Sequence, residues 1–275
     1  MTEQGRQAVP DGGDEHPTFD TSVAHLARVY DYWLGGKDNY AADRAAGDAV
    51  MQVYPGMAAS VRANRAFLAR VVRYLAGQAG IRQFLDIGTG IPASSNTHEV
   101  AQQVSPDCRV VYVDNDPVVL AHARALLTTT PQGSTDYIDA DLRDTSTILR
   151  QAAQTLDFSQ PVAVMLIAVL HVLGNDEDPH GVVAKLINAV PSGSYLAISH
   201  VPSDLEPDKA AEAGNRLNQL MHEKVTFRSH PEVTRFFDGL ELVKPGVVRV
   251  QEWRPDTEAG PELRWTMWGG LARKP

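Results

Sequence analysis

Hydrophobic and polar positions along the chain follow two different periods, and the change falls close to Gly80. Up to this glycine the apolar residues recur at helical spacing, most clearly over residues 60–76. Five apolar residues of that segment share one face of the predicted helix: Phe67, Leu68, Val71, Val72 and Leu75. We therefore predict helices before Gly80, which together with Gly77 ends the last of them, and a different architecture after it.

Beyond Gly80 short apolar runs alternate with helical patterns. Strands are expected at residues 83–88, 109–114, 134–141, 162–170 and 194–200. Helices are expected between them, over residues 97–103, 118–127, 147–154 and 182–190. The run 162–170, VAVMLIAVL, is apolar throughout, which is typical of a strand buried on both faces of a parallel sheet. The alternation predicts an α/β fold with a doubly wound, mostly parallel sheet.

The C-terminal part departs from this alternation. Helices are predicted over residues 207–223 and 231–238, and two strand-like segments follow at 241–253 and 263–274 without a helix between them. The stretch that joins these segments contains Pro and Gly, as turns do. We expect the segments to close the sheet as an antiparallel hairpin, which brings the predicted sheet to seven strands.

Length and composition bound the organisation of the chain. Its 275 residues suit one large α/β domain. We divide it into a tail over residues 1–18, a helical N-terminal extension over residues 19–80 and an α/β domain over residues 81–275. The tail is polar and rich in Gly and Pro, so we expect it to be disordered.

Charge and cysteine usage argue against several classes of function. The net charge of −9 argues against binding to nucleic acid or to a membrane surface, which requires a basic face. The single cysteine, Cys108, excludes a disulfide framework and a cysteine-based zinc cluster. No histidines and carboxylates have the spacing of metal ligands, so we expect no metal. The longest apolar run is shorter than the roughly 20 residues of a membrane helix, and no export signal is visible. We expect a cytoplasmic protein.

A glycine-rich turn follows the first predicted strand. The sequence FLDIGTG (84–90) places Asp86 at the end of the strand and Gly88, Thr89 and Gly90 in the turn. Glycine lets a ligand approach where a Cβ atom would clash, and ligands of open α/β sheets bind beyond the carboxyl ends of the strands. The turn is therefore a candidate cofactor loop, and a tight turn without a ligand is the alternative.

Acidic residues also follow the second and third predicted strands. Asp114 can accept hydrogen bonds from the two hydroxyls of a ribose, and Asn115 can bind an adenine edge. Asp141, with Leu142 beside it, can accept a hydrogen bond from an adenine amino group. The alternative for these carboxylates is to cap the next helix, a role that we assign to Asp116. Together the three loops predict a site for an adenosine-containing ligand.

Two cofactors fit this description. The run Gly88-x-Gly90-x-x-Ala93 satisfies the loose dinucleotide pattern, with an acidic residue further on, and supports an NAD(P)-dependent oxidoreductase. A carboxylate at Asp86 instead suits a cationic ligand end, such as an amino group or a sulfonium. The position of Asp141 and the terminal hairpin also favour S-adenosylmethionine (SAM).

The chain resembles the SAM-dependent methyltransferases that are abundant in actinobacteria and were long classified as a domain of unknown function. The resemblance rests on six segments: ARVYDYWLGGKDNYAADR (27–44), NRAFLARVVR (64–73), FLDIGTG (84–90), VYVDNDP (111–117), LHVLGN (170–175) and WGGLARKP (268–275). The first segment is the most specific, whereas class I methyltransferases in general share the glycine loop. Pro92 is a departure, because many members of that class have a third glycine there.

The resemblance implies a Rossmann-like class I fold, SAM as the cofactor and methyl transfer as the reaction. It implies that Asp86 and Gly88 lie near the methionine end of SAM, that Asp114 takes the ribose, and that Ile167 and Ala168 lie on the other side of the cofactor. It does not supply the acceptor, which we expect to be a small molecule. The alternatives are an NAD(P)-dependent oxidoreductase and a non-catalytic SAM-binding protein. The sequence does not reveal the oligomeric state, and a homodimer is left open.

Two kinds of polar residue are candidates for direct contact with the ligands. His171 follows the fourth strand, where acceptors usually enter this fold class, and would act as a general base if the acceptor must lose a proton. Its alternative role is that of a structural histidine under the neighbouring helix. Arg28, Arg62 and Arg65 are candidates to pair with the carboxylate of the cofactor, and Arg65 is our first choice.

The segment YDYWLGGKDNY (30–40) interrupts a helical stretch at Gly35-Gly36. Aromatic residues on both sides of the glycines could fold over the cofactor mouth and line an acceptor pocket, as a lid does. The alternative is a helix–turn–helix that packs against the edge of the sheet.

Overall fold

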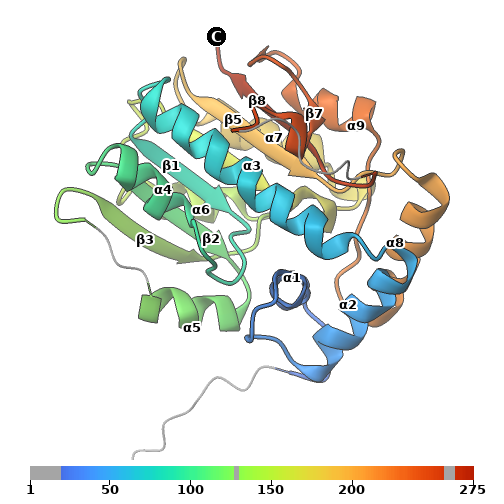
Figure 1. The fold of residues 1–275 in the computed structure, drawn as a ribbon. Coiled ribbons are helices and arrows are strands. Elements are labelled where there is room, and N and C mark those ends of the chain that lie inside the picture. Colours follow the sequence, from blue (N-terminus) through green and yellow to red (C-terminus); the bar gives the residue numbers. More distant parts are fainter. Residues whose placement is uncertain (1–19, 127–129, 257–263) are drawn as a thin grey trace, which may run out of the picture.

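One mixed sheet lies at the centre of the computed structural model, which describes residues 20–126, 130–256 and 264–275 (Figure 1). Five of its strands are parallel: β1 (Gln83–Ile87), β2 (Arg109–Asp114), β3 (Ser134–Asp139), β4 (Ala163–Ile167) and β5 (Tyr195–His200). The C-terminal strands are β6 (Glu241–Leu242), β7 (Val248–Arg249) and β8 (Trp268–Arg273). The order is β3-β2-β1-β4-β5-β8-β6, and β8 is antiparallel to β5, β6 and β7. The predicted doubly wound, mostly parallel sheet is confirmed.

The strand count of seven was wrong, because the first arm of the C-terminal hairpin is divided into two short strands and the sheet has eight. After β6 the chain turns at Gly246, where φ is 95° and the N–H donates to Val243 O at 2.9 Å. Pro245 precedes this turn and has no N–H group to continue the ladder. The antiparallel arrangement itself is confirmed, and the stretch 254–262 lies largely outside the described residues.

Two strands end earlier than the sequence pattern predicts. The apolar run 162–170 forms a strand only as far as Ile167, because Ala168 has a left-handed φ of 54°. Residues Leu170–Val172 then form a short 3-10 helix. Similarly, β3 ends at Asp139 and not at residue 141. Hydrophobic periodicity marks which segments are buried, and it does not show where the backbone leaves the extended conformation.

Helices cover both faces of this sheet (Figure 1). The α-helices are α1 (Leu26–Leu34), α2 (Ala41–Val53), α3 (Met57–Gly77), α4 (Thr97–Val104), α5 (Pro117–Leu126), α6 (Thr145–Ala152), α7 (Pro179–Asn188), α8 (Pro207–Leu220) and α9 (His230–Thr234). Apolar residues of α3 and α4 share one core cluster with alternate strand residues such as Phe84 and Met165. Residues of α6 and α7 share another cluster with the intervening residues, such as Leu85 and Leu166.

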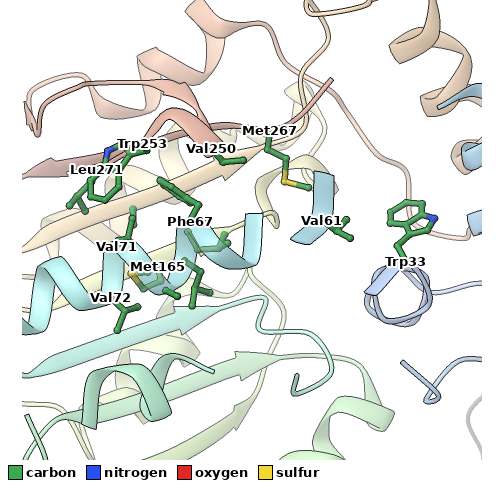
Figure 2. Packing of buried hydrophobic residues seen from close by; sticks show 14 of the residues in the cluster. Trp33, Val61, Phe67, Val71, Val72, Met165, Val250, Trp253, Met267 and Leu271 are labelled. Carbon is green, nitrogen blue, oxygen red and sulfur yellow. The ribbon is translucent and has the colours of Figure 1, made fainter. Parts of the chain in front are cut away.

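The long helix α3 belongs to the core of the sheet. All five apolar residues that the sequence placed on one face are buried: Phe67, Leu68, Val71, Val72 and Leu75. Figure 2 shows the side of α3 that carries Phe67 and Val71 packed toward Trp253 and the strand of Met165. The Phe67 and Trp253 rings meet edge to face, with centroids 5.6 Å apart. The helical segment before residue 80 therefore shares its hydrophobic core with the sheet.

Three further expectations concern the N-terminal tail, membrane-spanning helices and metal sites. The tail predicted over residues 1–18 lies outside the described residues. No helix of the described part is both long enough and apolar enough to cross a membrane. Within the same part of the chain, no group of three or more His, Cys, Asp or Glu side chains is arranged to hold a metal ion.

Replacing Phe67 with alanine should strongly destabilise the protein, because the ring is fully buried against Trp253. We expect Phe67→Ala to lower the free energy of unfolding by about 3–5 kcal/mol, the usual cost of truncating a buried aromatic ring. Urea denaturation measures this change. Arg62→Ala, on the exposed face of the same helix, is the matched control and should change stability by less than about 0.5 kcal/mol. Equal effects of the two variants would contradict the packing.

Candidate functional site

A single cavity lies beyond the carboxyl ends of the parallel strands and is bounded on its other side by α1 and α3. It encloses about 1490 Å³, counting its opening to solvent. Apart from the alternative arginines Arg28 and Arg62, the site residues predicted from the sequence line this cavity: Arg65, Asp86, Gly88, Thr89, Gly90, Asp114, Asn115, Asp141, Leu142, Ile167, Ala168 and His171. The structure therefore brings together residues that lie as far apart as 65 and 171 in the sequence.

The glycine loop is shaped by close packing on one side and open space on the other. Gly88 has a φ of 73°, and a Cβ atom there would lie 2.2 Å from Val169 Cγ2. Gly90 has a φ of 64°, and a Cβ atom there would meet nothing within 4 Å. Both positions require the left-handed backbone that glycine adopts readily. Gly88 is thus needed for packing, while Gly90 leaves room for a ligand.

Asp86 is a buried carboxylate at the end of β1. Its Oδ2 accepts a hydrogen bond of 2.6 Å from Thr97 Oγ1 at the start of α4. Burial raises the pKa of Asp86 to about 6, and the hydrogen bond from Thr97 only partly opposes this shift. A cationic group arriving in the cavity would favour the charged form of this side chain.

Asp114, at the end of β2, is held by the backbone around it. Its Oδ2 accepts from Gly90 N at 2.8 Å, and its Oδ1 accepts from Asn115 N at 2.9 Å and Asp116 N at 3.0 Å. Burial raises the pKa of Asp114 even though these backbone hydrogen bonds lower it. The carboxylate thus has a fixed orientation between the glycine loop and the start of α5, and the lone pair that remains on Oδ2 can accept a hydrogen bond from a ligand.

Helix capping is carried out by the neighbouring acids. Asp116 Oδ1 accepts from Val118 N at 2.7 Å in the first turn of α5, as we had assigned. Asp144 Oδ1 accepts from Thr147 N at 3.0 Å and caps α6. Asp114, at the end of β2, and Asp141, just after β3, precede these two capping residues and line the cavity.

Asn115 and Asp141 form one polar edge of the cavity, and Asn115 Nδ2 donates to Asp141 Oδ2 at 3.2 Å. Sequence reasoning missed Arg143, which also lines the cavity and lies 3.1 Å from Asp141 and 2.6 Å from Glu177. The sequence signal that could have identified Arg143 is its position, two residues after Asp141. Leu142, by contrast, is buried and apolar.

His171 combines features of both roles that we considered. The ring lines the cavity but is almost fully buried, and its Nδ1 has no hydrogen-bond partner among the described residues. Burial, with a smaller effect of the Arg228 charge, lowers the pKa of His171 to about 4. The low pKa leaves the imidazole neutral at pH 7 and makes it a weak general base.

Arg228 holds the segment that carries His171, and no motif in the sequence indicates this role. This buried guanidinium donates to Leu170 O at 3.0 Å and to Leu173 O at 2.8 Å. It also lies 3.0 Å from His200 Nε2, at the end of β5. Because its donors reach carbonyl groups on both sides of His171, Arg228 fixes the position of that ring.

Helix α1 lines the cavity with Tyr30, Asp31, Trp33 and Leu34, and the glycines that follow form a tight turn. Gly35 ends the helix with a φ of 84°. The Asp31 carboxylate accepts from Asp38 N at 3.0 Å and from Asn39 Nδ2 at 2.8 Å, which closes the turn. The segment is a helix–turn–helix, and it also lines the cavity.

A buried group of charges joins the start of α1 to the sheet. His25 Nδ1 lies 2.7 Å from Asp116 Oδ2, and Arg28 Nε lies 3.4 Å from Asp43 Oδ1. Burial lowers the pKa of His25, but the hydrogen bond and charge of Asp116 outweigh it, so the pKa is raised. The same interaction lowers the pKa of Asp116 against the effect of its burial. We refer to His25 and Asp116 as the latch pair.

The three candidate arginines have different surroundings. Arg65 lines the cavity and donates to Ser94 O and Ser95 O, each at 3.1 Å. Its Nε is buried and has no partner among the described residues. Arg28 takes part in the charge group beside the latch pair, and Arg62 is exposed. Of the three, Arg65 is the one that lines the cavity.

The strand order, the antiparallel C-terminal strand and the cavity at the carboxyl edge define a class I methyltransferase fold. Residues 13–275 match a family model described as S-adenosyl methyltransferase. The chain therefore belongs to the S-adenosyl methyltransferase family, and the resemblance noted in the sequence is confirmed.

Two solved structures are similar over nearly their whole length. A DUF574 family protein from Streptomyces avermitilis MA-4680 is 46% identical, with a TM-score of 0.90, over 93% of this chain and 99% of that one. A candidate methyltransferase from Thermobifida fusca YX is 42% identical, with a TM-score of 0.85, over 92% and 96% of the two chains. No curated protein sequence matches the chain significantly.

SAM is the cofactor of this family, and the chemistry of the cavity fits it. The Asp86 and Asp114 carboxylates can accept hydrogen bonds from an ammonium group and from ribose hydroxyls. The unpartnered Arg65 Nε can donate to a carboxylate. The lining also includes aromatic residues that these contacts do not use, such as Trp33, Phe227 and Trp265.

The latch pair should make stability depend on pH. Because the pKa of His25 is raised above its ordinary value of 6.5, the pair stabilises the folded state fully below pH 6.5 and loses this effect as pH rises through the raised value. We expect His25→Gln to lower the free energy of unfolding by about 1 kcal/mol at pH 6 and by less at pH 9.

Urea denaturation between pH 5 and pH 9 tests this dependence on the latch pair. His122→Gln is the matched control, because His122 lies 3.3 Å from Asp38 in a more exposed pair and should contribute less. A difference between the parent and His25→Gln that stays constant over this pH range would contradict the assignment.

Proposed function

We propose that the protein transfers the methyl group of SAM to a small-molecule acceptor bound in the same cavity. The observation that carries the proposal is the position of Asp86 and Asp114 at the ends of adjacent strands, on either side of a glycine loop, in one cavity. Asp86 and the loop Gly88-Thr89-Gly90 would hold the methionine end, and Asp114 the ribose. Arg65 would pair with the cofactor's carboxylate.

The adenine would lie between two groups of lining residues. Asn115, Asp141 and Leu142 offer hydrogen bonds and an apolar surface at one side. Ile167 and Ala168 offer a second surface at the end of β4, where the Ala168 N–H donates to Ser199 O at 3.0 Å. This arrangement supports an adenosine site in which the two surfaces that face the adenine ring lie a fixed distance apart.

The reaction needs little acid–base chemistry from the protein. Bound SAM supplies a methyl group on a positively charged sulfur. An acceptor lone pair would bond to the methyl carbon, and the electron pair of the broken carbon–sulfur bond would stay on sulfur. Orientation and exclusion of water can then provide much of the acceleration. His171, with its low pKa, would orient the acceptor by a hydrogen bond and would take a proton only from an acidic one.

Helix α1 and its turn would act as the cover of this site. Tyr30 and Trp33 of α1 line the cavity. The latch pair joins the start of α1 to Asp116, two positions after Asp114. A cover attached beside the ribose carboxylate would couple cofactor binding to closure. The chain is then a methyltransferase with an integral lid, and a non-catalytic SAM-binding protein is the second candidate, which an acceptor assay would separate from it.

Calorimetric titration of the purified protein with SAM, S-adenosylhomocysteine (SAH) and NADH tests the cofactor. We expect SAM and SAH to bind and NADH not to bind. Asp114→Ala should weaken SAH binding at least tenfold, because a hydrogen bond to a charged group contributes about 1.5–3 kcal/mol. Asp139→Ala, the exposed partner of Asp114 in the sheet register, is the control and should bind normally. Binding of NADH alone would contradict the proposal.

Asp86→Asn should change binding and stability in opposite directions. The pKa of Asp86 is raised from 3.8 to about 6, so the folded state loses stability as pH rises between these values. An uncharged side chain avoids this loss, and we expect a gain of about 1–3 kcal/mol in the free energy of unfolding at pH 8. SAH affinity should fall, and in the parent it should fall as pH drops below about 6.

Urea denaturation and SAH titration at several pH values measure the two effects of Asp86→Asn. The control is Asp157→Asn, an exposed carboxylate whose pKa is lowered by hydrogen bonds from Ser159, and it should bring no gain in stability. Loss of stability in Asp86→Asn with unchanged SAH affinity would assign Asp86 a structural role only.

A further inference from the structure

The cavity has a second half that the cofactor residues leave unassigned. Six of its lining residues, from α1, α3 and the C-terminal half of the chain, are aromatic or thioether side chains: Tyr30, Trp33, Met57, Phe227, Trp265 and Met267. We refer to this part as the aromatic compartment. Figure 2 shows Trp33 and Met267 near Val61, in the first part of α3. The polar strand ends described above make up another part of the lining.

The walls of the aromatic compartment are held in place by hydrogen bonds. Trp33 Nε1 donates to Gly47 O at 3.2 Å, and Trp265 Nε1 donates to Pro202 O at 3.4 Å. Tyr54 packs edge to face on Trp265, at 4.7 Å between centroids, and its hydroxyl donates to Trp265 O at 2.7 Å. Since both indole N–H groups are already paired, the two rings offer the compartment apolar surface only.

One polar atom beside these rings lacks a partner. Asn64 is 1% exposed and lines the cavity, and its Nδ2 donates to the Tyr30 hydroxyl at 3.0 Å. The Tyr30 hydroxyl in turn donates to Val61 O at 3.2 Å, which fixes the orientation of the amide. Asn64 Oδ1 is therefore an acceptor, and it is buried without a donor among the described residues. Such an atom is costly to leave unpaired, and a ligand N–H or O–H would satisfy it.

The charges around the compartment disfavour an anion. Glu223 lines the cavity and forms no salt bridge within the described part, and its charge contributes to the raised pKa of His25, which lines the same cavity. The Asp31 carboxylate lies on the same side and is occupied by the turn that follows α1. Arg65 is the cationic side chain on α3 that lines the cavity, and it is directed to the carbonyls of Ser94 and Ser95.

We propose that the aromatic compartment binds the methyl acceptor and selects an uncharged, flat, ring-bearing molecule whose single N–H or O–H donor pairs with Asn64 Oδ1. Ring faces and thioethers bind flat apolar molecules well, and the fixed walls reduce the entropy lost on binding. The inference rests on the proposed function, since it assigns to the acceptor the space that SAM leaves free.

The experiment titrates the full chain, saturated with SAH, with four probes by calorimetry at pH 7.5. The probes are 2-naphthol (flat, neutral, one donor), quinoline (flat, without a donor), 2-naphthoate (flat, anionic) and myo-inositol (polar). We expect 2-naphthol to bind about three- to tenfold more tightly than quinoline, the range of one net hydrogen bond. The anion should bind more weakly still, and the polyol should give no heat.

Two variants locate the site of binding. Asn64→Leu should remove the advantage of 2-naphthol over quinoline and leave SAH affinity within about twofold. Phe227→Ala should weaken both flat probes about tenfold, which corresponds to 1.4 kcal/mol, while Phe227→Leu retains most of their affinity. Thermal unfolding with and without SAH confirms that each variant is folded.

Each other outcome contradicts a defined part of the proposal. Loss of SAH affinity in Asn64→Leu would assign Asn64 Oδ1 to the cofactor. Binding of 2-naphthoate or inositol as tight as that of 2-naphthol, or no binding of 2-naphthol by protein that binds SAH, would overturn the acceptor class and leave the proposed function intact. Failure of SAH to bind the parent would instead contradict the proposed function, and titration of 2-naphthol without SAH would still test the compartment.

Discussion

The parallel register of β1 to β5 is the constraint on which the site depends. In that register Asp86 lies beside Tyr112, and Asp114 lies beside Asp139, so neighbouring strands end at nearly the same level. A side chain that follows any of these strands therefore reaches the same edge of the sheet. The helices that cover the faces leave this edge open, and α1 and α3 enclose the space beyond it. The position of the site therefore depends on the direction of the strands more than on any single residue.

Placing carboxylates at this edge has an electrostatic cost that shapes the rest of the molecule. Burial raises the pKa of both Asp86 and Asp114, because a charged carboxylate loses hydration there. The neighbouring Asp116 is compensated by His25, which the N-terminal segment brings to within 2.7 Å. Asp86 has a hydroxyl partner and forms no ion pair within the described part, and the charge of Arg65 opposes its raised pKa only in part. The carboxylate that the protein compensates less lies in the cavity, where a cationic ligand can bind, and the one that it compensates more, Asp116, lies at the start of α5.

How much the sequence revealed depends on whether the signal is local. The buried face of α3, the order of the strands and the acids after each strand are local features, and the structure has them where we expected, apart from the early ends of β3 and β4 and the division of the first hairpin arm. The early end of β4 depends on the backbone of Ala168, and no periodicity encodes that conformation. Arg228, Asn64 and Trp265 acquire their roles through residues more than 30 positions away, such as Tyr30, Leu170 and Pro202. Pairwise contacts of this kind cannot be read from one sequence.

The same long-range contacts determine how the cavity can discriminate between ligands. Its apolar walls are held by paired indole N–H groups, and Arg228 holds the segment around His171 through backbone carbonyls. A rigid apolar wall distinguishes poorly between molecules that differ by a methylene group, whereas a buried polar atom that must be paired discriminates strongly. In this cavity the glycine loop and its carboxylates can select the cofactor, and the unpartnered Asn64 Oδ1 and His171 Nδ1 are atoms that can select an acceptor. Selectivity then depends on leaving few polar atoms unpaired, because each additional one would require a partner from every ligand that binds.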